Sequence, residues 1–292
     1  MKLKDTKKVS IAYGLIALLL FGLTVCGCYG IYTKNKPAGE AEVVFLGDSV
    51  IAQSRDDSAI PRQVEQLTGR SVVNCALGGT SLSRGKAKRP GEQGDSMEDA
   101  NGVLSMEALS RAMIHGDFGG QQAVQSKEQA LYYLPYTVDT LASIDFAKVK
   151  VLVFNHGVND YHQGVELFND QDPYDVHTFS GAMRSVLERL RKEYPDLKII
   201  YVTPTYTWYH GPAKSCEEYH TGSGILKDYV DEAIRICEEY QVPYVDVYSS
   251  LYERYGMDGY VRKIAEQYTL DGVHPNEYGR GLIAEAIAET LK

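Results

Sequence analysis

Short apolar runs rich in β-branched residues recur along the chain after residue 41, and they predict the strands of a sheet. The runs cover residues 42–46, 71–75, 149–154, 198–202 and 243–247. They are apolar almost throughout, which is typical of strands that are buried on both faces. Between them, apolar residues recur at helical spacing over 60–68, 176–194, 225–240 and 278–291. This alternation predicts an α/β fold with a parallel sheet covered by helices on both faces.

The N-terminal residues follow a different pattern. The 25 residues from Val9 to Thr33 carry no charge, and four lysines and one aspartate precede them. A run of this length can cross the hydrocarbon core of a membrane as a helix. Because a basic flank stays in the cytoplasm, the rest of the chain is expected outside it.

Three interpretations of residues 1–33 remain open: an uncleaved signal anchor, a cleaved signal peptide and a lipoprotein signal. The lipoprotein interpretation depends on Cys26 and Cys28, whose preceding residues fit a lipobox only loosely. We favour the uncleaved anchor, because the run is long for a signal peptide and no Ala-x-Ala cleavage site is evident. All three interpretations predict a membrane-anchored or secreted domain outside the cytoplasm.

We expect residues 34–41 to be a linker and residues 42–292 to form one domain. About 65 residues separate the second predicted strand from the third, and we assign an insertion to about 84–145. Its first part, residues 84–102, is rich in glycine and charge and predicts an exposed loop, while 103–141 has helical stretches. Excursions of this length often shape a site or a lid.

Composition excludes several classes of protein. The fractions of hydrophobic residues (44%) and charged residues (24%) are those of a globular chain. The net charge of −9 divides into +3 for residues 1–33 and −12 for the rest, so a nucleic acid is not an expected partner. The dispersed Cys75, Cys216 and Cys237 suggest no zinc site, and no pair is singled out for a disulfide.

Four short motifs follow predicted strands or precede the last helix. They are Gly-Asp-Ser-Val at 47–50, Gly-Gly at 78–79, Gly-Val-Asn-Asp at 157–160 and Asp-Gly-Val-His-Pro at 271–275. Each motif alone is more often a cap or a turn. Ligands of parallel sheets, however, bind beyond the carboxyl ends of the strands. There the motifs would supply a nucleophile, oxyanion donors, a base and an acid that orients the base.

In order and spacing, these motifs resemble those of the SGNH hydrolases, also called GDSL esterases and lipases, over residues 42–290. The resemblance implies a three-layer α/β/α sandwich with a flavodoxin-like, five-stranded parallel sheet. Two features depart from the family: Val50 replaces the leucine of the name motif, and the insertion exceeds that of compact members.

Carried over residue by residue, the resemblance implies catalytic roles. Ser49 would be the nucleophile, His274 the general base and then acid, and Asp271 the residue that orients His274. The backbone amides of Ser49 and Gly79 and the side chain of Asn159 would form the oxyanion hole. The implied reaction is ester hydrolysis through an acyl-enzyme, with no cofactor and no metal.

The substrate is less constrained than the chemistry. The chain has 22 tyrosines against seven phenylalanines, and the tyrosine-rich stretch 201–210 contains the only tryptophan. Aromatic faces on a wet rim suit sugar rings. We therefore expect an esterase that removes O-acyl groups, acetyl above all, from carbohydrate. The alternatives are a lipid or lysophospholipid esterase, an acyl transferase and a glycan-binding module without activity.

Overall fold

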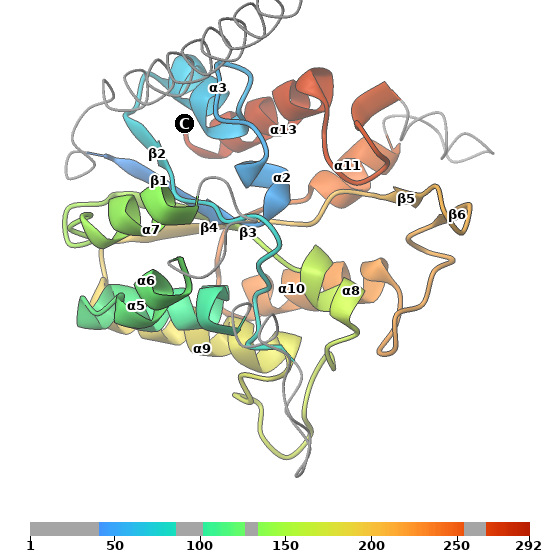
Figure 1. Cartoon of the computed structure of the whole chain (residues 1–292), viewed down its shortest axis with the longest axis horizontal. Helices are drawn as coiled ribbons and strands as arrows, with labels where there is room; N and C mark the ends of the chain where they lie inside the picture. The colour runs from blue at the N-terminus through green and yellow to red at the C-terminus, as the bar shows by residue number, and fades with distance from the viewer. Residues whose placement is uncertain (1–40, 86–101, 126–133, 254–266) are drawn as a thin grey trace, which may run out of the picture. The chain divides into compact units, whose positions relative to one another are not determined.

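Five parallel strands form the central sheet in the computed structural model (Figure 1). The order across the sheet is β2-β1-β3-β4-β7, the flavodoxin-like order that the resemblance implies. The strands are β1 (Val43–Gly47), β2 (Val72–Asn74), β3 (Val151–Asn155), β4 (Lys198–Val202) and β7 (Tyr244–Val245). Each coincides with one of the five apolar runs, with β1 and β3 extending one residue beyond theirs, so the sequence prediction of the sheet is confirmed.

The structure describes residues 41–85, 102–125, 134–253 and 267–292. The predicted membrane segment, nearly all of the predicted linker and most of the predicted exposed loop at 84–102 lie outside these residues. Within the described residues, no helix has the length and apolar character needed to cross a membrane.

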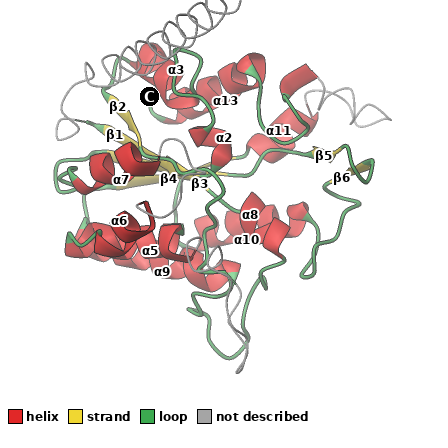
Figure 2. Ribbon diagram, in the orientation of Figure 1, coloured by secondary structure: helices red, strands yellow, loops and turns green. Residues whose placement is uncertain are grey.

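One face of the sheet is covered by helices from both ends of the domain (Figures 1 and 2). These are α2 (Ser49–Ala52), α3 (Ile60–Thr68), α11 (Val247–Glu253) and α13 (Glu277–Thr290). Side chains alternate along a strand, so Val43 and Phe45 point to this face together with Val151 and Val153. They form one buried cluster with Ile51, Ile60, Ile283 and other residues of these helices.

The opposite face is covered by α8, α9 and α10 (Figure 1). Their bounds are Val158–Gln163, Phe179–Glu193 and Leu226–Glu239. The alternate strand residues, such as Leu46 and Phe154, are fully buried, as is the apolar stripe of α9. Both predicted layers are therefore present, and the predicted helices 60–68, 176–194, 225–240 and 278–291 match α3, α9, α10 and α13 to within a few residues.

The insertion contributes helices of its own: α5 (Met106–His115), α6 (Gly119–Gln125) and α7 (Leu134–Ala142). Helix α5 packs along α9, and α6 packs against α7. A short antiparallel hairpin, β5 (Trp208–Tyr209) with β6 (Lys214–Ser215), follows β4. The sequence did not indicate this hairpin, because two-residue strands carry no periodic pattern.

A buried carboxylate joins the insertion to the layer below the sheet. Glu107 of α5 is completely buried and pairs with Arg111 on its own helix, with Arg84 after β2 and with Arg189 of α9. The Arg111 and Arg189 nitrogens lie 2.6 and 2.8 Å from the carboxylate. Burial opposes the charge of Glu107, but the arginines outweigh it and hold its pKa below the usual value. A charge buried with its partners in this way is costly to leave unpaired.

We predict that Glu107→Gln lowers the free energy of unfolding by about 2–3 kcal/mol at neutral pH, because three arginines lose their common counter-charge. The pKa of Glu107 is lowered in the folded state, so its contribution is present above the unfolded pKa of about 4.3 and fades in acid. The difference between wild type and variant should therefore shrink below that pH. Urea denaturation at several pH values measures this.

Glu65→Gln, which removes a surface partner of Arg62, is the matched control and should change the free energy of unfolding little. Equal effects of the two substitutions would contradict the assignment.

Candidate active site

Ser49 stands at the turn where β1 ends and α2 begins. Gly47 ends the strand, and a Cβ there would lie 2.9 Å from the Ile51 side chain and 3.0 Å from the Asn155 carbonyl oxygen, so the exit is tight. Asp48 caps α2 by accepting a hydrogen bond from the Val50 amide at 2.9 Å. Ser49 is thus the first residue of the helix and is partly exposed beyond the sheet edge.

Asp271 and His274 lie in the loop before α13. Asp271 accepts hydrogen bonds from the amides of Val273 and His274 through Oδ1, at 3.0 and 2.8 Å. Its Oδ2 lies 2.7 Å from Nδ1 of the His274 ring. Partial burial opposes the charge, but these hydrogen bonds bring the pKa of Asp271 below its ordinary value. The carboxylate is therefore ionised at neutral pH and holds both the backbone and the ring of His274.

The structure brings the three predicted catalytic side chains together. The Nε2 of His274 lies 2.9 Å from Oγ of Ser49, across 225 residues of sequence. Since Asp271 accepts a hydrogen bond from Nδ1–H of His274, Nε2 is the acceptor for the hydroxyl of Ser49. The chain of Asp271, His274 and Ser49 has the hydrogen-bond order of a catalytic triad.

The other two predicted residues lie on neighbouring turns. Gly79 has a positive φ of 76°, which suits glycine, in the turn after β2. The Nδ2 of Asn159, at the start of α8, donates to the carbonyl of Thr80 at 2.9 Å, one residue beyond Gly79. The β2 turn is tied to β1 by a bond of 2.8 Å from the Leu77 amide to the Gly47 carbonyl.

Backbone amides remain available at this edge of the sheet. Within the described part of the chain, the N–H groups of Ser49 and Gly79 donate to no backbone carbonyl and no side chain. The Ser49 amide is free because the first N–H groups of a helix have no acceptor within it. The predicted oxyanion hole requires free amides at Ser49 and Gly79, and the described contacts leave both amides free. The Asn159 carboxamide has a second N–H besides the one that binds Thr80.

Asp160 is a positioning residue that sequence reasoning missed. It is buried, and it accepts hydrogen bonds from the amides of Leu82 and Ser83 at 2.7 and 2.9 Å and from the Ser83 hydroxyl at 2.6 Å. These bonds tie α8, which carries Asn159, to the segment that follows Gly79. Burial raises the pKa of Asp160 to about 6, although its three donors oppose that shift. The only sequence signal was its place in the 157–160 motif.

Two more buried titratable groups lie at the same strand ends. Burial raises the pKa of Asp48, next to the nucleophile, to about 7. Burial lowers the pKa of His156 to about 3, so this histidine is neutral at physiological pH. Its Nε2 lies 3.3 Å from the Thr80 hydroxyl, so its contact is with the turn after β2.

The β5–β6 hairpin packs directly on the Asp271–His274 loop. The amide of Trp208 donates to the carbonyl of Gly272 at 2.8 Å. Gly272 has a φ of 93°, and a Cβ there would overlap the Trp208 carbonyl oxygen, so glycine is needed for this approach. The tyrosine-rich stretch 201–210 therefore reaches the loop that carries the histidine.

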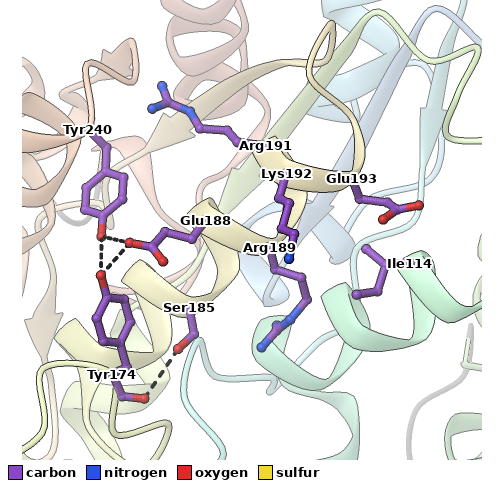
Figure 3. Close-up of a pocket in the computed structure, with 9 residues that line it drawn as sticks. All are labelled: Ile114, Tyr174, Ser185, Glu188, Arg189, Arg191, Lys192, Glu193 and Tyr240. Atoms are coloured by element: carbon purple, nitrogen blue, oxygen red, sulfur yellow. Dashed lines mark hydrogen bonds between the residues drawn. The ribbon is translucent and has the colours of Figure 1, made fainter.

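A separate pocket of about 720 Å³ lies along α9 and contains none of these residues (Figure 3). Its Tyr174 and Tyr240 hydroxyls both bind the Glu188 carboxylate.

Among the described residues, no group of three or more His, Cys, Asp or Glu side chains could hold a metal ion. In the described part of the chain, Cys75, Cys216 and Cys237 are buried and form no disulfide.

Comparison with known families gives one match that spans most of the chain. The model of the GDSL-like lipase/acylhydrolase family matches residues 43–287, which include all four motifs. No protein with a curated description matches the sequence.

Several solved structures share the fold. A protein from Lactobacillus plantarum is 17% identical, with a TM-score of 0.57 over 87% of this chain and 97% of that one. A candidate GDSL-like lipase from Parabacteroides merdae is 17% identical, with a TM-score of 0.52 over 87% and 97%. The acetyl xylan esterase AlAXEase is 14% identical, with a TM-score of 0.51 over 86% and 99%. At these identities the likeness is one of fold.

Proposed function

The chain belongs to the GDSL-like lipase/acylhydrolase family and is an ester hydrolase, and we propose that it removes O-acetyl groups from carbohydrate through an acyl-enzyme. The observation that carries the chemistry is the hydrogen-bonded chain from Ser49 Oγ through His274 to Asp271, with distances of 2.9 and 2.7 Å. This arrangement activates a serine hydroxyl for attack on an ester carbonyl.

In the proposed reaction, the Ser49 oxygen attacks the carbonyl carbon while His274 Nε2 takes the hydroxyl proton. The tetrahedral oxyanion accepts hydrogen bonds from the amides of Ser49 and Gly79 and from Asn159 Nδ2. His274 then gives its proton to the departing alcohol, which leaves Ser49 acylated. A water molecule, deprotonated by His274, releases the carboxylic acid and restores the hydroxyl. Asp271 stabilises the charged imidazole throughout.

The carbohydrate part of the proposal is supported by the position of the aromatic stretch. The Trp208 amide binds the backbone of the His274 loop, so the hairpin lies against the loop that carries the proposed general acid for the departing alcohol. Aromatic faces with polar tips suit sugar rings. A solved structure of the same fold is an acetyl xylan esterase, so this fold accommodates such substrates.

We also propose that the enzyme works outside the cytoplasm, where glycans are available. This proposal depends on the uncharged run from Val9 to Thr33 and the lysines before it.

We predict that the full chain releases acetate from acetylated xylan and that Ser49→Ala lowers kcat by about 10⁴–10⁶-fold, the usual loss for a triad member. Mass spectrometry of the released acetate and of the deacetylated product measures this. Ser54→Ala, which removes a hydroxyl bonded to Asp56, is the control and should retain activity. Near wild-type turnover by Ser49→Ala would refute the mechanism. A wild type that cleaves lysophospholipids but not acetylated xylan would replace the carbohydrate assignment with the lipid one.

Asn159→Ala should lower kcat by about 10²–10³-fold while KM changes little, because an oxyanion donor acts chiefly in the transition state. Steady-state kinetics on p-nitrophenyl acetate test this. Asn169→Ala, which removes an amide bonded to Asp175 before α9, is the matched control. An increase in KM with unchanged kcat would show that Asn159 binds substrate rather than the oxyanion.

A further inference from the structure

A histidine and a tyrosine from different elements meet beside the triad. The Nε2 of His162 lies 2.7 Å from the hydroxyl of Tyr209, and the two rings meet edge to face with centroids 5.5 Å apart. The ring of Tyr219 is tilted against that of Tyr209, with centroids 5.2 Å apart, and Tyr219 is 38% exposed. We call these three residues the aromatic rim.

The rim is fixed to both sides of the catalytic machinery. His162 follows Asn159 by three positions on α8, so the two residues share one face of that helix. Tyr209 is the neighbour of Trp208, whose amide binds Gly272 in the loop of His274. The rim therefore connects the helix of the candidate oxyanion donor with the loop of the candidate base.

The rim lies near the candidate base, His274. His162 is close enough to His274 for the charge of one ring to affect the other. His274 is the group that hands its proton to the leaving alcohol oxygen. A group close to His274 is consequently placed to meet the alcohol part of the ester rather than its acyl part.

The rim is also uncharged at physiological pH. Desolvation of the ring, and secondarily His274, lowers the pKa of His162 to about 4, although part of the residue is exposed. Burial raises the pKa of the Tyr209 phenol above its ordinary value. Neutral imidazole and phenol groups both donate and accept hydrogen bonds, as sugar hydroxyls do.

Hydrogen-bonding capacity remains after the two side chains have bound each other. Their contact uses Nε2 of His162, and Nδ1 has no partner among the residues that the structure describes. The Tyr209 hydroxyl also interacts with the side chains of Thr207 and Tyr161, and a phenol oxygen can take part in more than one hydrogen bond. Beside them, the exposed ring of Tyr219 offers an apolar face.

We propose that His162 and Tyr209, with Tyr219, form a subsite that binds the uncharged sugar carrying the acetyl group. This inference rests on the proposed function and adds residues that determine specificity for the alcohol part. The hydroxyls of the sugar would bond to the imidazole and the phenol, and its ring would lie against Tyr219. None of the three residues takes part in bond breaking.

The test compares two acetyl esters that differ only in their alcohol. Full-length wild type, Tyr209→Phe and His162→Gln are assayed for kcat/KM on acetylated xylo-oligosaccharides and on p-nitrophenyl acetate. Losing one hydrogen bond between uncharged groups lowers affinity by about 2–10-fold. Each variant should therefore lower the ratio of the oligosaccharide value to the p-nitrophenyl value by up to about tenfold, chiefly through KM. Tyr209→Phe keeps the ring contacts and so guards against loss of fold.

Tyr174→Phe is the matched control, since it removes a tyrosine hydroxyl in the separate pocket on α9, and its ratio should equal that of wild type. An unchanged ratio in both rim variants would overturn the subsite. The ratio would also stay unchanged if both esters lost activity equally, and that result would mean that the rim only supports the triad. Failure of the proposed function is distinguishable, because it would appear in the wild type as inactivity on both esters or on the oligosaccharide alone.

Discussion

The parallel pairing of β1 with β3 is the constraint on which the site depends. After β1 the chain adds β2 at one edge of the sheet, then returns to add β3 and the remaining strands on the other side of β1. The strand order therefore reverses between β1 and β3. Helices on either side of such a point diverge, so the strand ends are open to a ligand. The register sets Gly47 opposite Asn155, and the Asp48 amide donates to the Asn155 carbonyl at 3.1 Å. Ser49 and Asn159 consequently leave the sheet side by side, each at the start of a short helix.

Distant segments complete the site by packing on this pair of strand ends. The loop of Asp271 and His274 comes from the last 22 residues of the chain. It is held by its own hydrogen bonds and by the backbone of the β5–β6 hairpin, which closes on Gly272. The hairpin in turn meets α8 through Tyr209 and His162. The candidate base, the candidate oxyanion donor and the proposed sugar subsite therefore belong to one connected set of contacts.

Much of this arrangement was predictable from sequence because its signals are local. The five strands are apolar runs, and α3 and α10 show the helical spacing of buried residues. The motif residues fall at strand ends, where a parallel sheet must gather them. The hairpin, the role of Asp160 and the contact of His162 with Tyr209 were not predictable. The contacts of Asp160 and His162 depend on partners 47 to 78 residues away in sequence. The hairpin is local, but its two-residue strands are too short to show a periodicity.

Covalent trapping of the nucleophile tests the central claim most directly. With Nε2 of His274 2.9 Å from its hydroxyl, Ser49 should react with a fluorophosphonate probe in the native full-length chain. Peptide mass spectrometry should then place a single phosphonyl group on that residue. Prior denaturation should abolish the reaction, since it separates Ser49 from His274. Labelling at another residue, or no labelling of the folded protein, would contradict the account.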